Sequence, residues 1–461
     1  MGAIALADFG STYTKLSLVD PEEGRLLAHA EAPTSIGTDL MEGFGAALEA
    51  ARRAVGDIEV DEAIAASSAG GGLRVAAVGL VADLTAAAAR QAALNAGARV
   101  GTVLAGRLEP AHLEELRAAR PEIVLFAGGT DGGQGELVLE NARRLAAARL
   151  STRFVVACNS AVAGEVAEVL EEAGTAAEVA GNVMPRLGEI EVESAREAIL
   201  RAFLDHVIGG KGLSRDPEFE RMVRMPTPEA VLEATRLLSH GSERVPGVGD
   251  VVVVDVGGAT TDVHSSRQTE MATPGVEDPL LPPPPTLRTV EGDLGLRSGS
   301  AGVLAADGRW IESEAALDEE ALGQAVALRS NDSQWIPDDP EEARLDQLLA
   351  VGCVTHALRR HCGTMLLSRG ENGPPTLVRD GPDLREVDQV LGTGGVFAHR
   401  DDGREILAAA LERRAPRSLA PYEPPLRVDG NYVLAAAGLL STVNVDAAAL
   451  LLQRELDLIR T

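Results

Sequence analysis

The stretch VVVVDVGGATTDV, from Val251 to Val263, organises the whole chain. Four consecutive valines are too β-branched for a helix and too continuous for a half-exposed strand, so they predict a strand buried on both faces. Asp255 ends this strand, and Gly257 and Gly258 follow, where a missing Cβ lets backbone amides approach a ligand closely. The backbone amides at the glycines can bind an anion, and the Asp255 carboxylate can bind the cation that accompanies it. The stretch therefore favours a site for a metal-bound phosphate. A purely structural hairpin is the alternative interpretation.

The N-terminus repeats this plan. IALADFGSTYTKLSL, from Ile4 to Leu18, runs from apolar residues through Asp8 and Gly10 to hydroxyl side chains and a second apolar stretch. Two copies so far apart predict two similar half-domains. Each half-domain would present one phosphate hairpin to a shared cleft.

The overall composition excludes several classes of function. The chain has 461 residues, 45% of them apolar, and a formal net charge of −28, which disfavours nonspecific binding to nucleic acid or to anionic membranes. Aromatic residues make up only 3%, which argues against stacking along a single strand of nucleic acid. No apolar run approaches membrane-spanning length and no targeting segment is recognised, so we expect a cytoplasmic protein. The oligomeric state is not predictable.

Cysteines and lysines are both rare. The three cysteines, Cys158, Cys353 and Cys362, show no CxxC pairing, which fits small buried residues in a reducing compartment better than a metal site. Only two lysines occur among 42 basic residues. Lys15 lies in the first hairpin and is predicted to approach phosphate. Lys211, in a Gly-Gly-Lys-Gly loop, is a weaker candidate for the same role.

The first half of the chain changes pattern near residue 99. Residues 4–31 predict a three-stranded meander, 38–55 a helix, 64–68 a strand beside which 73–81 could pair, and 84–95 a helix. From residue 99, short strands alternate with helical patterns, which predicts a mostly parallel sheet. Within it, Phe126–Gly133 is a glycine-rich strand end that can bind a ligand or simply turn.

The second half contains one further glycine-rich motif. After a proline-rich excursion at 274–285 and a Glu291–Gly295 turn with two carboxylates, a helix is predicted to begin at Pro340. The carboxylates could position metal or water, or simply form a solvated turn. Leu391 then leads through glycines into the helix-like 396–398, an arrangement that can receive an adenosine or a phosphate. The chain is expected to end in helix after a turn at 429–431.

These patterns divide the chain into four parts. Residues 1–98 begin a first lobe, and 99–245 form a mostly parallel α/β region that completes it or is inserted in it. Residues 246–430 form the second lobe, and 431–461 form a C-terminal helix. The expected fold class is α/β, with two similar lobes and an inserted α/β subdomain.

The order of Asp8–Lys15, Val251–Asp262 and Leu391–Ala398 resembles the phosphate-1, phosphate-2 and adenosine motifs of the actin, hexokinase and heat-shock-70 superfamily of ATPases. The family resemblance covers nearly the whole chain: Ala7–Lys15, Phe126–Gly133, Asp255–Asp262 and Glu291–Gly295 look like the glutamate mutase accessory (MutL/GlmL-type) family. This family is distinct from the mismatch-repair protein called MutL. No peptide-binding domain follows residue 430, so peptide chaperoning is not expected.

This resemblance implies a two-lobed actin-like ATPase built from duplicated ribonuclease H-like domains, one in residues 1–98 and their continuation and one in 246–430. It also implies ATP and Mg²⁺ as ligands. Asp8 and Asp255 would hold Mg²⁺ through water or orient the attacking water, and Lys15 would add positive charge near the transferring phosphoryl group. Asp262 would support the second hairpin or an ion. The remaining residues expected to bind ATP are Gly10, Ser11, Thr12, Gly257, Gly258, Ala259, Thr260, Thr261, Gly392, Gly394 and Gly395.

The resemblance also implies a function, an accessory ATPase that reactivates an adenosylcobalamin-dependent mutase such as glutamate mutase. We see no corrinoid-binding motif, so cobalamin would belong to the partner subunit. Three alternatives stay open: a small-molecule kinase of the same fold, an activator of a radical dehydratase, and a nucleotide-binding scaffold without turnover. The cysteine spacing does not support the iron–sulfur cluster that a dehydratase activator needs.

Overall fold

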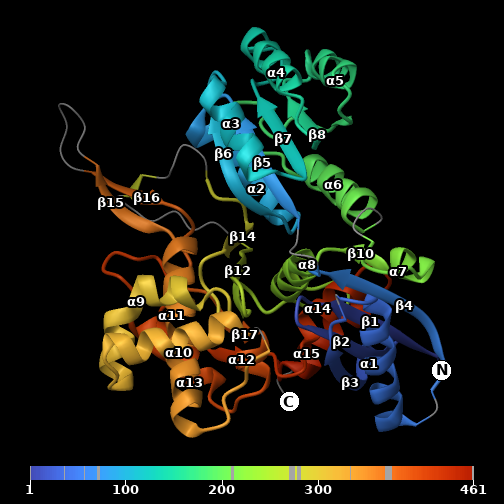
Figure 1. Cartoon of the computed structure of the whole chain (residues 1–461), viewed down its shortest axis with the longest axis vertical. Coiled ribbons are helices and arrows are strands. Elements are labelled where there is room, and N and C mark those ends of the chain that lie inside the picture. Colours follow the sequence, from blue (N-terminus) through green and yellow to red (C-terminus); the bar gives the residue numbers. More distant parts are fainter. Residues whose placement is uncertain are drawn as a thin grey trace.

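The computed structural model describes residues 2–35, 37–56, 58–69, 73–208, 212–268, 276–277, 282–332, 334–368 and 376–458. Two lobes lie side by side, and a third α/β unit stands above them (Figure 1). Lys211 and its two preceding glycines lie outside the described residues, as does most of the 274–281 part of the proline-rich excursion.

The first lobe is built on a five-stranded sheet of order β10-β4-β1-β2-β3. β1, β2 and β3 form the predicted antiparallel meander, while β4 and β10 continue the sheet in parallel. Helix α1 (Leu40–Val55) covers one face and is capped by the Asp39 carboxylate. The strands are β1 (Ala3–Phe9), β2 (Tyr13–Asp20), β3 (Arg25–Pro33), β4 (Val60–Ser67) and β10 (Val223–Met225).

The second lobe repeats this topology. Its sheet has the order β14-β12-β11-β17-β18, with an antiparallel meander followed by two parallel strands. The same sequence of pairings in both lobes confirms the duplicated ribonuclease H-like fold. The strands are β11 (Val251–Val256), β12 (Thr261–Ser266), β14 (Thr286–Glu291), β17 (Gln389–Thr393) and β18 (Leu426–Val428).

Helices and a small sheet complete the second lobe. The predicted helix at Pro340 is confirmed as α11 (Pro340–His361), and Gly352 does not interrupt it. A Cβ at Gly352 would lie 2.8 Å from Val303 Cγ1, so glycine lets α11 pack closely on α9. The other elements are α9 (Ser300–Ala315), α10 (Glu319–Asn331), α13 (Gly403–Glu412), and the sheet β13-β16-β15 of Val276–Glu277, Thr376–Asp380 and Thr364–Ser368.

The unit above the lobes is a parallel sheet of order β6-β5-β7-β8-β9, inserted between β4 and β10. Residues 73–81 were expected beside β4, and this pairing is wrong: β5 pairs with β6 and β7. Five of the six β5 residues are buried, which suits a central strand covered on both faces. The strands are β5 (Arg74–Gly79), β6 (Arg99–Ala105), β7 (Ile123–Gly128), β8 (Arg153–Cys158) and β9 (Ala177–Val179).

Helices surround the inserted sheet and connect it to the first lobe. The predicted helix at 84–95 consists of a π-helical turn (Ala82–Ala86) followed by α2 (Ala87–Asn95). The others are α3 (Pro110–Ala119), α4 (Glu136–Ala148), α5 (Ala163–Glu172), α6 (Glu193–Ala202), a π-helical segment (Phe203–Ile208) and α7 (Pro217–Met222).

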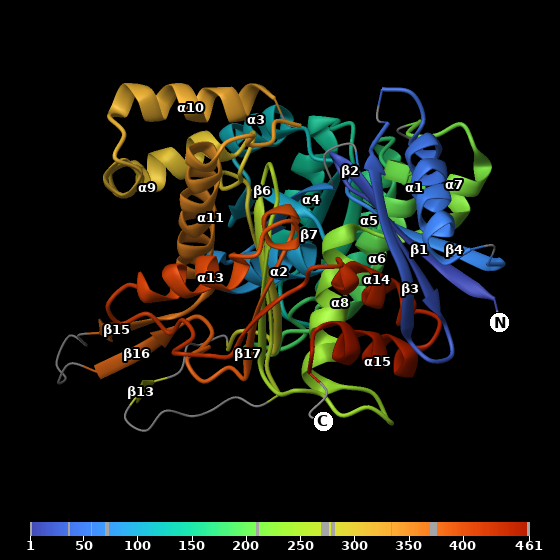
Figure 2. The same ribbon diagram turned by 90° about the horizontal axis from the view of Figure 1, so that it is seen from below.

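The two lobes share one hydrophobic core through exchanged helices. Helix α8 (Thr227–His240) leaves the first lobe and packs against β11 and β12, while α14 (Val433–Leu440) returns to pack against β1 and α8. Helix α15 (Val445–Glu455) packs on β3 and α8. In both views α8 and α14 lie next to each other between the lobes (Figure 2).

Successive side chains of β1 and β11 point to opposite faces of their sheets, which determines the core that each one enters. Ile4 and Leu6 of β1, with Val251 and Val253 of β11, face the shared core around α8 and α14. The intervening residues face separate cores on the outer sides of the two sheets. Both strands are therefore covered on both faces, as the valine run predicts, and their ends point toward the same interlobe region.

A buried arginine joins the inserted unit to the second lobe. Arg288 on β14 is 1% exposed, and its guanidinium donates to the carboxylate of Asp262 and, at 2.8 and 2.9 Å, to the backbone oxygens of Leu94 and Ala98. The two carbonyls lie at the end of α2, where a cation also complements the helix dipole. This one side chain therefore connects α2 to the strand β12 of the second hairpin.

Replacing Arg288 with Ala should destabilise the protein by about 3–5 kcal/mol, because it leaves the buried Asp262 carboxylate without its cation and takes one donor from each of two carbonyls. The change would be measured as a shift of the first urea unfolding transition. Arg186→Ala is the matched control, since that side chain is 82% exposed, and should cost less than about 0.5 kcal/mol. Equal effects of the two substitutions would contradict the role of Arg288 as a stabilising link between the inserted unit and the second lobe.

Candidate functional site

The first hairpin places Asp8 and Lys15 directly opposite one another. They are register partners at the end of β1 and the start of β2, and Lys15 Nζ lies 3.5 Å from Asp8 Oδ2. Asp8 is 6% exposed, and it also accepts a hydrogen bond from the Thr227 hydroxyl at the start of α8. The predicted carboxylate therefore has a fixed position at the edge of the interlobe region.

The second hairpin is supported by the loop that follows β14. Asp255 pairs in register with Asp262 on one side and with Thr393 of β17 on the other. The amide of Leu296 donates to Gly257 O at 3.0 Å, and the amide of Arg297 donates to Gly258 O at 2.7 Å. These bonds hold the glycine turn without using its own amides.

Not every predicted phosphate-binding amide is open. Gly10 N–H donates to Asp8 O and Tyr13 O at 3.0 and 3.2 Å, and Gly257 N–H donates to Thr260 O at 2.9 Å, so these two amides close their own turns. The structure shows no hydrogen bond from the amides of Ser11, Thr12, Gly258 and Ala259 to any described residue. Two consecutive amides therefore stay open in each hairpin.

Asp255 shows that the two hairpins act on one another electrostatically. Burial, together with the negative charges of Asp262, Asp8 and Asp429, raises its pKa to about 7, while the positive charge of Lys15 opposes the rise. Asp8 and Lys15 belong to the first lobe and Asp255 to the second. Their charges are thus close enough to interact between the lobes, and burial is the largest cause of the raised pKa of Asp255.

The predicted adenosine motif lies beside the same carboxylate. Gly394 follows β17 with φ +99°, and a Cβ there would lie 2.9 Å from Asp255 Oδ1 and 2.4 Å from Val256 O. Only glycine fits this close approach. Gly395 begins the short helix α12 (Gly395–Ala398), and the Gly392 position is packed against the Phe397 ring.

Two residues of this region were not predicted from the sequence. Asp429 was interpreted only as part of a turn, but it is 1% exposed and accepts hydrogen bonds from the amides of Val433 and Leu434 and from the Thr393 hydroxyl. It therefore fixes the start of α14 against β17. Tyr432 precedes α14, with φ +51° and 7% exposure, and its ring centroid lies 4.2 Å from Lys15 Nζ.

A carboxylate with two histidines spans the lobes next to Tyr432. Glu31 Oε1 of β3 lies 3.6 Å from His29 Nε2 and 3.4 Å from His399 Nε2, and His399 follows α12 of the second lobe. The pKa of Glu31 is lowered: burial works against its charge, but the two histidines and Lys15 outweigh it. These residues belong to no motif, so sequence reasoning had no signal by which to find them.

Several other predicted positions have structural partners. Asp262 binds Arg288, and the hydroxyl of the fully buried Thr261 donates to Leu294 O at 3.0 Å. Glu291 and Asp293 both bind Arg360. The Phe126–Gly133 stretch begins on β7 in the inserted unit, away from the hairpins in the fold.

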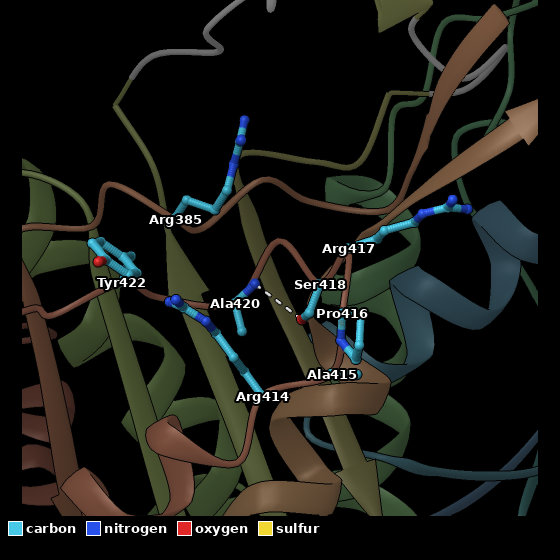
Figure 3. Close-up of a pocket in the computed structure, with 8 residues that line it drawn as sticks. All are labelled: Arg385, Arg414, Ala415, Pro416, Arg417, Ser418, Ala420 and Tyr422. Carbon is cyan, nitrogen blue, oxygen red and sulfur yellow. Dashed lines mark hydrogen bonds between the residues drawn. The ribbon is translucent and has the colours of Figure 1, made fainter.

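A cavity of about 400 Å³ lies elsewhere in the second lobe (Figure 3). Its lining includes Arg385, Arg414, Arg417 and Tyr422, none of which belongs to a predicted motif. The Arg414 guanidinium lies 4.2 Å from the Tyr422 ring centroid, and the other two arginines extend toward different parts of the rim. Because the three guanidinium groups do not converge, we assign no ligand to this cavity.

Each hairpin carries an aspartate and two open amides. A carboxylate suits a divalent cation and open amides suit a phosphate, so these groups are of the kind that a metal-bound phosphate requires. The described residues contain no group of three or more His, Cys, Asp or Glu side chains that could hold a metal ion. All three cysteines are buried and free, and burial raises the thiol pKa of Cys158 and of Cys353 to about 12.

No described helix is long and apolar enough to cross a bilayer. The duplicated sheets, exchanged helices and paired aspartate hairpins define a two-lobed protein of the actin-like ATPase fold. The family model described as "MutL protein" matches residues 4–456. Protein MutL of Clostridium tetanomorphum is 39% identical over 460 residues, covering 99% of each chain. The chain therefore belongs to the MutL family.

The solved structures that match the chain are much more remote. A nucleotide-free acetone carboxylase has a TM-score of 0.39 at 14% identity, covering 95% of this chain and 70% of that one. A glycerol dehydratase reactivase has a TM-score of 0.35 at 11% identity, covering 95% and 99%. A Streptomyces griseus glucokinase in complex with glucose and AMPPNP has a TM-score of 0.32 at 11% identity, covering 97% and 98%. Similarity this low carries no information about activity.

Asp255 makes stability depend on pH in a definite direction. Its folded pKa of about 7 exceeds the ordinary value of 3.8, so the folded state binds more protons between these values and stability falls as pH rises through this window. Relative to Asp255→Asn, the wild type should lose on the order of 2–4 kcal/mol between about pH 4 and about pH 8. Urea unfolding at both pH values measures this loss.

Asp401→Asn, in an exposed turn, is the control and should keep the wild-type pH dependence. If the stability profiles of the wild type and Asp255→Asn run parallel across this pH window, the account of Asp255 is wrong.

Proposed function

We propose that the protein binds and hydrolyses MgATP in the interlobe cleft and acts as a reactivating factor for an adenosylcobalamin-dependent mutase such as glutamate mutase. The observation that supports this best is the electrostatic interaction of Asp8 and Lys15 with Asp255 between the two hairpins. Family membership supports the accessory role, since the whole chain aligns with Protein MutL.

The proposed roles follow from what each group can donate or accept. The open amides of Ser11, Thr12, Gly258 and Ala259 would bind the β- and γ-phosphates, and the turn at Gly394 and Gly395 would receive the adenosine. Asp8 and Asp255 would bind Mg²⁺ through water or orient the attacking water. Mg²⁺ would supply charge neutralisation at the phosphates.

Lys15 would place its positive charge near the transferring phosphoryl group. In this fold the protein contributes positioning and electrostatic stabilisation rather than covalent chemistry. The remaining predicted residues would act by holding these groups in place; they are Gly10, Gly257, Thr260, Thr261, Asp262 and Gly392. This division agrees with their internal contacts, in which Asp262 binds Arg288 and Thr261 binds Leu294 O.

The exchanged helices give the nucleotide a way to control a partner surface. Because α8 and α14 share one core, movement of one lobe is transmitted to the other through packed side chains. Ligand contacts from both hairpins would favour closure, and loss of the γ-phosphate would release it. The nucleotide state would thereby change which surface meets the mutase.

The test combines nucleotide and partner. The immobilised protein is mixed with the cobalamin-binding mutase subunit and Mg²⁺, with either ATP or ADP, and the retained subunit is quantified beside phosphate release. We expect retention to differ several-fold between the nucleotides. Asp255→Asn should lose hydrolysis and this difference, while Asp401→Asn keeps both.

Other outcomes select the alternatives. ATP consumption that requires one small acid or sugar would indicate a kinase, and binding without hydrolysis would indicate a scaffold. Iron bound to the purified protein would instead support the alternative that it activates a radical dehydratase. Equal capture of the mutase subunit with both nucleotides, or none with either, would refute the proposed partner role.

A further inference from the structure

Tyr432 lies between Lys15 of the first hairpin and the predicted adenosine-binding turn at Gly394 and Gly395. Its ring centroid is 4.2 Å from Lys15 Nζ, a distance at which an aromatic face attracts a cation. Its hydroxyl lies 3.6 Å from the position a Cβ on Gly395 would take. The same residue therefore contacts the predicted catalytic lysine and borders the predicted nucleotide site.

The position of Tyr432 is fixed by its surroundings. The ring stacks on His29 with centroids 5.6 Å apart, and the hydroxyl lies 3.3 Å from His399 Nε2. Asp429 holds the next two amides of α14 in place. These contacts keep Tyr432 at φ +51°, a left-handed conformation that is uncommon for a bulky residue and persists only where the environment enforces it.

The Lys15 ammonium needs a contact that fixes its position. Its side chain is long and 24% exposed, and Asp8 attracts it at 3.5 Å on the first lobe. Asp255 of the second lobe also attracts the Lys15 ammonium. An aromatic surface at the start of α14 restricts where the ammonium can sit between these two carboxylates.

We propose that Tyr432 is a positioning residue that holds the Lys15 ammonium at the interlobe site. The effect on turnover rests on the proposed ATPase function. The contact between the ring and the ammonium does not. The aromatic ring makes the contact, and the hydroxyl stays neutral because burial and the nearby carboxylates raise its pKa. Tyr432→Phe should therefore behave like the wild type, while Tyr432→Leu removes the interaction.

The scarcity of lysine allows a direct measurement. Lys15 and Lys211 are the only lysines, so a Lys211→Arg protein has one lysine left. Reductive ¹³C-methylation keeps the charge and labels Lys15 together with the N-terminal amine, whose lower pKa distinguishes it.

The ring should shift the Lys15 methyl proton resonance upfield in the Lys211→Arg protein. The same shift should be present when Tyr432→Phe is added, and it should be lost when Tyr432→Leu is added. An unchanged resonance in the Tyr432→Leu protein overturns the proposal without reference to ATP.

A double-mutant cycle tests whether the contact between Tyr432 and Lys15 contributes to ATP hydrolysis. Tyr432→Leu should lower kcat about tenfold with little change in KM, the size expected for loss of a partly buried cation–aromatic contact. In a Lys15→Met background the same substitution should have no further effect. Additive losses would show that Tyr432 acts only through packing and would overturn the proposal. Absence of hydrolysis in the wild type would refute the ATPase function and leave the resonance experiment to decide on Tyr432.

Discussion

The Asp255 carboxylate is the constraint on which the rest of the structure depends. It lies near the end of a strand buried on both faces, beside Asp262 and within reach of Asp8 and Asp429, and its pKa is raised to about 7. Lys15, from the other lobe, opposes this accumulation of negative charge only in part. A folded protein normally avoids such an arrangement, and it persists most readily where a bound cation completes it.

The architecture keeps this carboxylate in place from two directions. Val251 and Val253 of β11 pack into the core shared with α8 and α14, while Val252 and Val254 pack into the outer core of the second lobe. The turn that follows is held by backbone bonds from the 294–299 loop, and Arg288 binds the opposite strand to the inserted unit. The site therefore rests on rigid elements, and the lobes are joined by exchanged helices rather than by a flexible linker.

The sequence predicted the elements whose patterns are local. The valine run, the aspartate–glycine hairpins, the meander and the helix at Pro340 all depend on neighbouring residues, and the structure contains each of them. The pairing of residues 73–81 was wrong because strand partners are chosen by long-range packing. Tyr432, Asp429 and Arg288 carried no motif, since their importance comes from contacts with residues far away in the chain.

The central claim is that both hairpins bind one metal–nucleotide complex. Electron paramagnetic resonance of Mn²⁺·ATP, with Mn²⁺ in place of Mg²⁺, tests this most directly by counting bound complexes in the wild type, Asp8→Asn and Asp255→Asn. The account predicts one complex per chain, with affinity weakened at least about tenfold by either substitution alone. Full-strength binding in either variant, or two independent complexes per chain, would contradict it.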